Sequence, residues 1–307
     1  MPRPDRPPEI DPVTSVRLGH YPLVRSGKVR ELFDLGDALL IVVTDRLSAF
    51  DVILPTPIPG KGRVLSAISD FWFDRTTDLV ANHRTPRSLD DLDLLDGERA
   101  LLEGRSSIVR KAERIDIECV VRGYLAGSGW KEYQATGTLV GSPLPSSLQR
   151  GARLPKPLFT PAIKNDAGHD QNVSRPALVD MVGRELASLL EERSLELYQR
   201  GAAVAAEAGF TLADTKFEFG WIEGALTLID EALTPDSSRY WSVEAPAPGA
   251  EPASFDKQIV RDWLETTGWN KMDPGPSLPP SIVAETRQRY LEVLERLRTV
   301  AKNGAKP

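Results

Sequence analysis

The sequence predicts an α+β fold with antiparallel sheets, on three observations. The first part of the chain is rich in short apolar runs bounded by turn residues. The second part mixes strand candidates with amphipathic helices, and the regular strand–helix alternation of a doubly wound parallel sheet is absent. A chain of 307 residues is long enough for one large or two ordinary domains. We expect a flexible proline-rich arm over 1–12, a β-rich N-terminal lobe over 13–115 and an α+β C-terminal lobe over 116–307.

Composition excludes several kinds of site. Hydrophobic residues make up 41% and charged residues 27% of the chain, as in ordinary globular proteins. Cys119 is the single cysteine, which excludes an intramolecular disulfide and a zinc site of paired cysteines. Its place inside an apolar strand, between Glu118 and Val120, predicts buried packing. The three histidines, at positions 20, 83 and 169, are too widely separated to suggest a histidine-rich metal site.

Charge and hydropathy limit the partners. The net charge of −6 argues against a general nucleic-acid binder, which needs a basic excess. The first residues lack the apolar core of a signal peptide, and no apolar run approaches the ~20 residues that span a bilayer. We therefore expect a cytoplasmic protein, a monomer or small homo-oligomer, that acts on small molecules and contacts neither membrane nor nucleic acid.

In the first part of the chain, two apolar runs at 29–33 and 39–44 flank Gly36-Asp37 and predict a hairpin. Helical spacing follows over 63–80, and strand composition returns at 108–111 and 115–122.

In the second part, we expect a long proline-bearing connection over 141–163. Ser174 is expected to cap a helical block that ends near Gly209, with a second helix starting at Ser194. The remaining predicted elements are strands at 211–219 and 225–233, a linker at 245–253, a helix capped by Ser254 and a final helix over 280–302.

The strand at 212–220 carries the first chemical signal. Since side chains alternate along a strand, Asp214, Lys216 and Glu218 point to one face, and Phe217 and Phe219 to the other. An ordinary amphipathic strand with a solvated charged face explains this spacing equally well.

The next strand turns abruptly acidic at Asp230. A turn centred on Gly224 would place Glu218 opposite Asp230 on one face, and such like charges need compensation. Carboxylate oxygens suit Mg²⁺, which would supply it. A two-residue Glu223-Gly224 turn would instead put Asp230 on the opposite face.

Cationic groups at several points favour anionic ligands. Lys28 and Arg30 alternate onto one face after Gly27, where a phosphate would fit, although this is no Walker A motif and a solvated basic pair is the simpler explanation. Polar residues crowd the end of a strand at 44–51. Further candidates are Arg122, Ser128, Arg239 and the pair Lys257 and Arg261, four residues apart on the helix after Ser254. Together they suggest one anionic substrate and one metal-bound nucleotide.

Seven segments in order resemble those of the SAICAR synthetase family (phosphoribosylaminoimidazole-succinocarboxamide synthases). The segments are 27–30, 45–51 (DRLSAFD), 118–128, 164–174, 212–220 (LADTKFEFG), 230–241 and 254–264 (SFDKQIVRDWL). Two positions depart from the family pattern. Asp116 stands where proline is usual, and Gln171 replaces a glutamate, which removes a charge near the amino-acid pocket that the resemblance implies.

The resemblance implies a ligase of purine biosynthesis. ATP, carboxyaminoimidazole ribonucleotide (CAIR) and L-aspartate give SAICAR, ADP and phosphate through an acyl phosphate, with Mg²⁺ as cofactor. It also implies a two-lobed fold related to ATP-grasp ligases, with ATP bound between the lobes.

The resemblance also implies roles for individual residues. Those for ATP are Gly27, Lys28, Arg30, Glu118 and Lys216. Those for CAIR are Arg122, Ser128, Arg239, Lys257 and Arg261. Asp45, Ser48, Asp51, His169 and Asp170 belong to the aspartate side, and Glu218 and Asp230 hold the metal. Lys216 and Asp170 are the candidate catalytic residues, Asp170 as acceptor of the amine proton. A lone histidine such as His169, in a polar loop, is otherwise most often a loop or capping residue.

Two other readings remain open. A small-molecule kinase of related architecture would use the same acid–lysine strand for phosphoryl transfer to a hydroxyl. A non-catalytic nucleotide sensor would bind without turnover, although it has no need of both metal carboxylates. A ligase differs from the kinase in requiring an amine and releasing no stable phosphorylated product.

Overall fold

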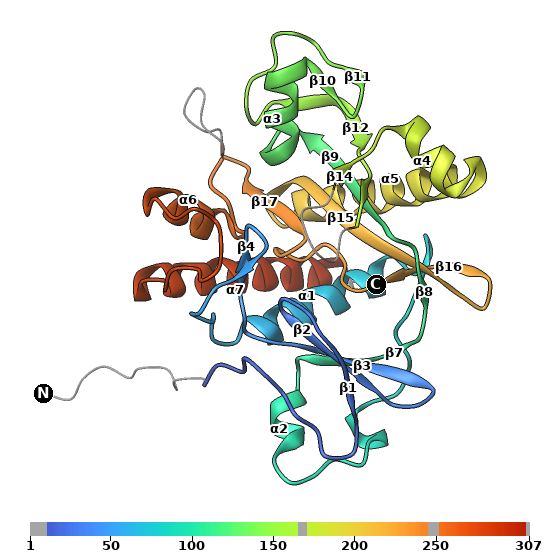
Figure 1. Ribbon diagram of the computed structural model, residues 1–307, viewed down its shortest axis with the longest axis vertical. Helices are drawn as coiled ribbons and strands as arrows, with labels where there is room; N and C mark the ends of the chain where they lie inside the picture. The colour runs from blue at the N-terminus through green and yellow to red at the C-terminus, as the bar shows by residue number, and fades with distance from the viewer. Residues whose placement is uncertain (1–10, 165–170, 245–251, 305–307) are drawn as a thin grey trace, which may run out of the picture. The chain divides into compact units, whose positions relative to one another are not determined.

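The computed structural model describes residues 11–164, 171–244 and 252–304 (Figure 1). The chain forms two compact units. The first comprises Met1–Ala67, Arg84–Val109 and Ile259–Leu291, and the second Ile68–His83, Arg110–Gln258 and Glu292–Pro307. The units interleave along the sequence, whereas the lobes expected above are continuous. The boundary at residue 115 between the two expected lobes stays a prediction.

A four-stranded sheet organises the first unit, in the order β1-β2-β3-β7. Its strands are β1 (Leu23–Ser26), β2 (Arg30–Asp34), β3 (Ala38–Val43) and β7 (Ser106–Arg110). Strands β2 and β3 pair antiparallel with Asp34 opposite Leu39, and Gly36 in the connection has a φ of 85°. The hairpin predicted at Gly36-Asp37 is confirmed.

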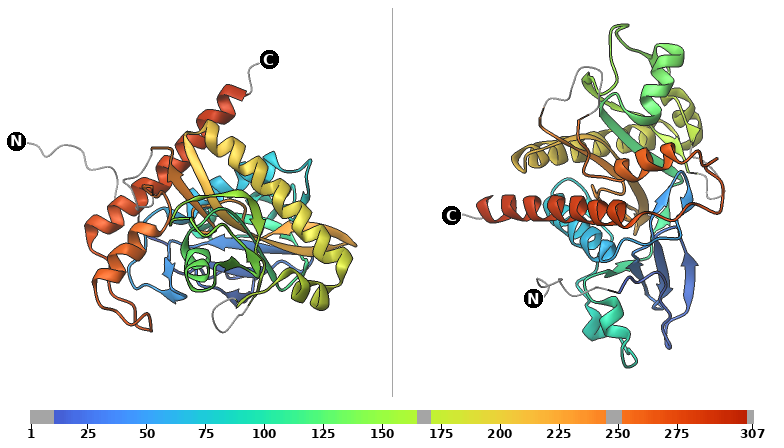
Figure 2. Two further views of the ribbon diagram at one scale, coloured as in Figure 1. Left: turned by 90° about the horizontal axis from the view of Figure 1, so that it is seen from above. Right: turned by 90° about the vertical axis from the view of Figure 1, so that its left-hand side faces the viewer.

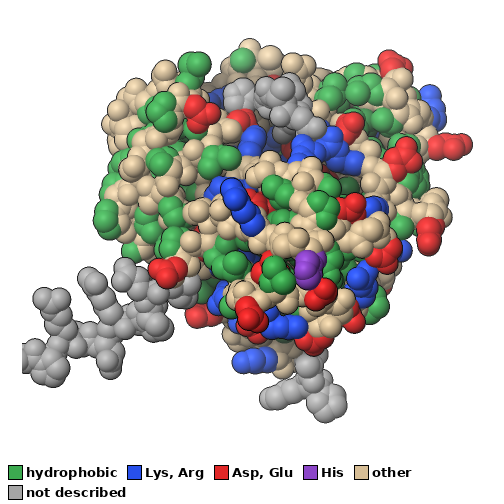
Figure 3. Space-filling view, turned by 60° about the horizontal axis from the view of Figure 1, so that its bottom comes forward, with side chains coloured by type: hydrophobic (Ala, Val, Ile, Leu, Met, Phe, Trp, Pro, Cys, Tyr) green, Lys and Arg blue, Asp and Glu red, His purple; other side chains and the backbone are tan. Residues whose placement is uncertain are grey.

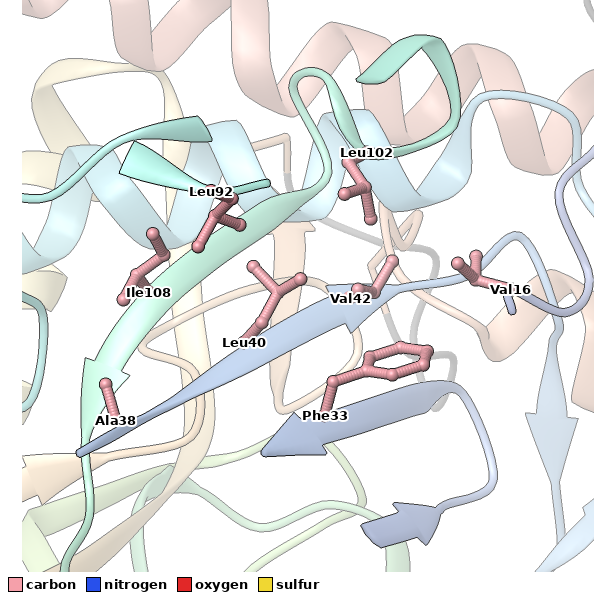
Figure 4. Close-up of a cluster of buried hydrophobic side chains, with 8 residues drawn as sticks. All are labelled: Val16, Phe33, Ala38, Leu40, Val42, Leu92, Leu102 and Ile108. Carbon is pink, nitrogen blue, oxygen red and sulfur yellow. The ribbon is translucent and has the colours of Figure 1, made fainter. Parts of the chain in front are cut away.

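One face of this sheet carries a buried apolar cluster (Figure 4). Its members are Val16, Phe33, Ala38, Leu40, Val42, Leu92, Leu102 and Ile108. Along β3, fully buried Leu40 and Val42 alternate with half-buried Leu39 and Ile41, as the pleat of a strand requires. The cluster fixes the register, because a one-residue slip would bring the other face to the core.

Short elements complete the first unit. They are β4 (Ser48–Ala49), β5 (Val52–Ile53), the 3-10 helix η1 (Leu89–Asp91), α2 (Glu98–Leu102) and most of α6 (Gln258–Thr266). Val260 and Leu264, four apart on α6, are buried in a second apolar cluster with Leu47, Leu54 and Ile58.

A nine-stranded sheet forms the centre of the described part of the second unit. Its strands are β6 (Ala81–Asn82), β8 (Glu113–Arg114), β9 (Ile117–Tyr124), β12 (Arg153–Phe159), β13 (Ala162–Ile163), β14 (Gln171–Asn172), β15 (Phe210–Ile222), β16 (Ala225–Ile229) and β17 (Ser238–Ser242). The long strand β15 pairs antiparallel with β9 and β17 along its first half and with β16 and β8 along its second. Strands β10 (Thr138–Leu139) and β11 (Ser142–Pro143) form a separate hairpin.

Helix α5 (Arg184–Glu207) packs along β15 and β9 (Figure 2). Helix α3 is Gly127–Thr136, and α4 is Arg175–Val182. Ser174 caps α4 as predicted, because its hydroxyl accepts a hydrogen bond from the Ala177 N–H at 3.3 Å. The predicted break at Ser194 is wrong. The chain breaks at Gly183, whose φ of 83° suits glycine, and Ser194 lies buried inside α5 with its hydroxyl donating to the Leu190 carbonyl.

Two further helices agree with the periodicity of the sequence. They are α1 (Lys61–Arg75) and α7 (Pro280–Gly304). Each contributes residues to both units.

Two sequence expectations are corrected here. The connection over 141–163 contains strand β12, whose prolines did not prevent pairing, since it meets β9 with an irregular register between Arg153 and Leu158. Ser254 does not cap a helix. It forms a bridge to Trp241, and α6 begins four residues later, where Asp256 accepts a hydrogen bond from the Gln258 N–H.

The distribution of surface charge and the burial of Cys119 can be compared with what the sequence predicts. Basic side chains are interspersed with acidic ones on the face seen in Figure 3. Cys119 is fully buried, as predicted, and burial raises the pKa of its thiol to about 12. Among the described residues, no helix has the length and apolar character needed to span a bilayer.

Candidate active site

The charged side chains of β15 do not form a solvated face. Asp214 lies opposite Arg122 of β9 and Arg239 of β17, and Lys216 lies opposite Val120 of β9. Asp214 is 5% exposed and Glu218 8%. Burying a carboxylate is costly unless a hydrogen-bond donor or a cation binds it. Asp214 and Glu218 both have such partners.

Two arginines converge on Asp214. Arg239 donates to its Oδ2 atom, and the Arg122 guanidinium lies 3.4 Å from the same oxygen. Arg122 also donates to the Thr160 hydroxyl at 3.0 Å and to the Ser128 hydroxyl at 3.1 Å. Burial lowers the pKa of Arg122, while Asp214 opposes that shift. The structure thus brings together the expected Arg122, Ser128 and Arg239.

Gly127 allows this cluster to close. A Cβ atom at this position would lie 2.3 Å from a terminal nitrogen of Arg239, and the backbone φ is 55°. Both the space and the left-handed conformation favour glycine here.

A second cluster surrounds Lys216. Its ammonium donates to Glu118 Oε1 at 2.6 Å. Burial lowers the pKa of Lys216, but the negative charges of Glu118, Glu218 and Asp230 outweigh burial and raise that pKa above its ordinary value. Lys216 is therefore a permanent cation among three carboxylates.

Lys164 completes this cluster and was missed in the sequence. Lys164, which follows β13, pairs with Glu218 Oε2, and both side chains are largely buried. No spacing along the chain predicts the contact, because it depends on the pairing of β13 with β9. Its only sequence signal is its place in the matched segment 164–174.

The predicted register of β15 and β16 is wrong. Glu218 lies opposite Ile229, because the connecting turn is the two-residue Glu223-Gly224, with φ values of 51° and 78°. Asp230 does not face Glu218 across the hairpin. Strand alternation stops at Asp230, whose φ is 67°, and its carboxylate lies close enough to raise the pKa of Lys216.

The first unit holds a separate group of predicted residues. The Gly27 N–H donates to the Arg30 carbonyl at 2.8 Å, closing a tight turn. Lys28 pairs with Asp51, and both side chains are about half exposed. The structure thus joins a residue expected to bind phosphate with one expected on the aspartate side. Ser48 is buried in β4, next to the Phe50-Asp51 turn.

Asp45 is bound within the first unit. Its side chain is fully buried, lies 3.0 Å from the Arg105 guanidinium, and accepts hydrogen bonds from the Val13 and Gly62 N–H groups. These contacts give Asp45 a structural role, and its expected place on the aspartate side stays a prediction.

Of the expected pair Lys257 and Arg261, Arg261 lies within α6 and Lys257 does not. Lys257 precedes the first residue of α6 and lies 3.7 Å from Asp236. His169 and Asp170 lie outside the described residues. Within the described ranges, no group of three or more His, Cys, Asp or Glu side chains is arranged to hold a metal ion by itself.

The chain is similar to known proteins over most of its length. The family model described as SAICAR synthetase matches residues 23–276. The phosphoribosylaminoimidazole-succinocarboxamide synthase of Thioalkalivibrio sulfidiphilus is 53% identical over 289 residues, covering 93% of this chain and 98% of that protein. The enzyme of the same name from Methylococcus capsulatus is 53% identical over 283 residues, covering 91% and 95%.

A solved structure agrees. The SAICAR-synthase of Saccharomyces cerevisiae, determined in complex with SAICAR, superposes with a TM-score of 0.86 at 39% identity, covering 94% of this chain and 98% of that one. An α+β fold with antiparallel sheets is thereby confirmed. On the matched family model and these near-full-length relatives, the chain belongs to the SAICAR synthetase family.

Proposed function

We propose that this protein joins L-aspartate to the carboxylate of CAIR at the expense of ATP, giving SAICAR, ADP and phosphate. Family membership and the name of a relative 53% identical over almost the whole chain support this reaction. The observation that carries it is the buried charged face of β15, where two clusters of cations and carboxylates lie two residues apart along the strand.

The chemistry of the reaction explains what such a site must supply. A carboxylate is a poor electrophile because its leaving group would be oxide. Phosphorylation by ATP converts it to an acyl phosphate, which the aspartate amine attacks with loss of phosphate. Since this step brings a carboxylate up to a polyphosphate, fixed positive charge is the main requirement.

The cluster on Asp214 is suited to the ribotide. Arg122 and Arg239 both contact Asp214, and planar guanidinium groups match phosphate or carboxylate oxygens. We assign CAIR binding to these arginines with Ser128. Lys257 and Arg261 are also assigned to CAIR, at its anionic end.

The cluster on Lys216 is suited to the nucleotide. Glu118 and Lys216 are assigned to ATP, Lys216 as the fixed cation that offsets charge as the phosphoryl group is transferred. Glu218 and Asp230 fit Mg²⁺, which in proteins is commonly held by one or two carboxylates plus substrate phosphates. When bound, Mg²⁺ would supply charge neutralisation at the phosphates.

The remaining roles belong to residues of the first unit and to two residues outside the described ranges. Gly27, Lys28 and Arg30 are assigned to the ATP phosphates. Ser48 and Asp51 are assigned to the aspartate side, with His169 and Asp170, and Asp170 is the proposed acceptor of the amine proton. No covalent nucleophile is required, because the amine of the substrate attacks directly.

The test is phosphate release from ATP and Mg²⁺ with CAIR, with and without L-aspartate. Release that requires both substrates, with an equal amount of SAICAR formed, is the expected result. Stable phosphorylation of a hydroxyl substrate would favour a kinase, and tight ATP binding without turnover would favour a nucleotide sensor. Lys216→Met provides the control for a contaminating ATPase, since its phosphate release should fall to background.

A further inference from the structure

The side chain of Arg46 lies against the turn formed by residues 27–30. It is 13% exposed and none of the roles above uses it. Its guanidinium donates to the carbonyl oxygens of Lys28 at 3.1 Å, Gly27 at 2.9 Å and Arg30 at 3.3 Å. A single side chain therefore holds three carbonyl groups of one turn.

Thr44 holds the remaining carbonyl. Its hydroxyl and its N–H donate to the Val29 oxygen at 2.8 and 2.9 Å. All four carbonyl groups of residues 27–30 are thus bound by the segment 44–46. In a planar trans peptide the N–H points opposite to the C=O. The N–H groups of Lys28 and Val29 are consequently directed away from Arg46.

The other end of Arg46 is anchored. Its guanidinium also donates to the Thr14 carbonyl and, at 2.9 Å, to Glu31 Oε1. Glu31 is buried, and its second oxygen accepts a hydrogen bond from the Val16 N–H at 2.9 Å. A planar fork of five donors can bind these acceptors at once, which a lysine ammonium with three donors cannot.

We propose that Arg46 is a positioning residue for nucleotide binding. It fixes the 27–30 turn so that the N–H groups of Lys28 and Val29, together with the Lys28 ammonium, face a phosphate of the nucleotide. Successive N–H groups in a turn form an anion-binding concavity. The inference rests on the proposed function, since it names what shapes the phosphate loop of that reaction.

Steady-state kinetics of Arg46→Gln and Arg46→Lys test the inference. We expect the KM for ATP to rise roughly tenfold or more, the scale of losing charged hydrogen bonds, while the KM for CAIR changes less than about twofold. Arg46→Lys should restore little of this. Arg87→Gln is the matched control, because Arg87 forms an exposed ion pair with Asp37 in the same unit, and its KM for ATP should stay unchanged.

Two further measurements separate positioning from general damage. Thr44→Val removes only the hydroxyl bond to Val29, so it should raise the KM for ATP less than Arg46→Gln does and leave the unfolding temperature nearly unchanged. Free guanidinium ion at millimolar concentration should partly restore the KM of Arg46→Ala, whereas methylammonium should not. Equal KM changes for ATP and CAIR, or an unchanged KM for ATP, would overturn the inference.

Binding of ADP to the same variants distinguishes this inference from the proposed function. A wild-type protein that binds ADP but forms no SAICAR would refute the proposed reaction alone. Unaltered ADP affinity in Arg46→Gln would refute the positioning role alone.

Discussion

The Lys216 ammonium lies 2.6 Å from Glu118 Oε1, between the neighbouring strands β15 and β9. Glu118 is buried, whereas the Lys216 side chain is 36% exposed. The carboxylates around it raise the pKa of Lys216. Lys216 is therefore a fixed charge and does not exchange protons near neutral pH.

Glu118→Gln tests this relationship through pH. A lysine whose folded pKa is raised contributes stability that is present below its unfolded pKa and is lost as pH rises through the folded pKa. Without the negative charge of Glu118, less charge offsets the lowering of the Lys216 pKa by burial, so that pKa falls. We expect unfolding temperature and kcat/KM for ATP to decline at lower pH in Glu118→Gln than in the wild type, when measured between about pH 6 and 10.

Asp78→Asn is the control for the loss of one carboxylate. Asp78 is an exposed acid of the same unit, paired with Arg200. Its pH profile should follow that of the wild type. Superimposable alkaline limbs in Glu118→Gln and wild type would contradict the fixed-charge role of Lys216.

The faces of β15 were predictable, and its neighbours were not. The period of two places Asp214, Lys216 and Glu218 together whatever pairs with them. The register with β16 depends on where the turn lies, and shifting the turn by one residue exchanges faces, which is why Asp230 was placed opposite Glu218. Lys164 reaches Glu218 only because β13 pairs with β9, and no local pattern records such pairing.

The ends of the helices were likewise predictable in one case and not in another. Ser174 was recognised because a capping serine acts on N–H groups within three residues. Ser194 has the same chemistry, but its hydroxyl binds a carbonyl of the preceding turn inside α5, and glycine at 183 breaks the helix instead. The seven matched segments identified the family, because their order does not depend on the exact element boundaries.

Asp230→Asn should abolish turnover and leave the fold intact. The change removes one of the two proposed metal carboxylates. Asp230 lies just after the end of strand β16, so the backbone pairing of the sheet does not depend on its side chain. Turnover at saturating CAIR and L-aspartate, titrated with Mg²⁺, provides the measurement, with circular dichroism as the check on folding. Near-normal turnover at saturating Mg²⁺ would refute the metal role.

Asp45 and Asp51 should respond in opposite ways to the change to asparagine. Asp45→Asn leaves the Arg105 guanidinium buried without its charge partner, so we expect a loss of roughly 3–5 kcal/mol in unfolding free energy. The KM for L-aspartate should stay within about twofold, since the Asp45 carboxylate is fully buried and already bound by Arg105 and by the Val13 and Gly62 N–H groups.

Asp51→Asn breaks an exposed pair with Lys28, of a kind worth about 0.2–1 kcal/mol, so its stability should change little. Its KM for L-aspartate or ATP should rise, because both partners are assigned to ligands. Denaturant unfolding and steady-state kinetics on the two variants provide the comparison. A raised KM for L-aspartate in Asp45→Asn, with unchanged stability, would restore the role first expected for Asp45.

Arg122→Ala should mainly raise the KM for CAIR. Asp214 keeps Arg239 as a partner after the substitution, so no carboxylate is left buried alone and the fold should persist. Asp214→Asn is the informative counterpart, because it removes the carboxylate that both guanidinium groups contact and should cost stability as well as affinity. Steady-state kinetics with each substrate varied, together with thermal unfolding, distinguish the two effects. An increase in KM confined to ATP in Arg122→Ala would place the Asp214 cluster at the nucleotide instead of the ribotide.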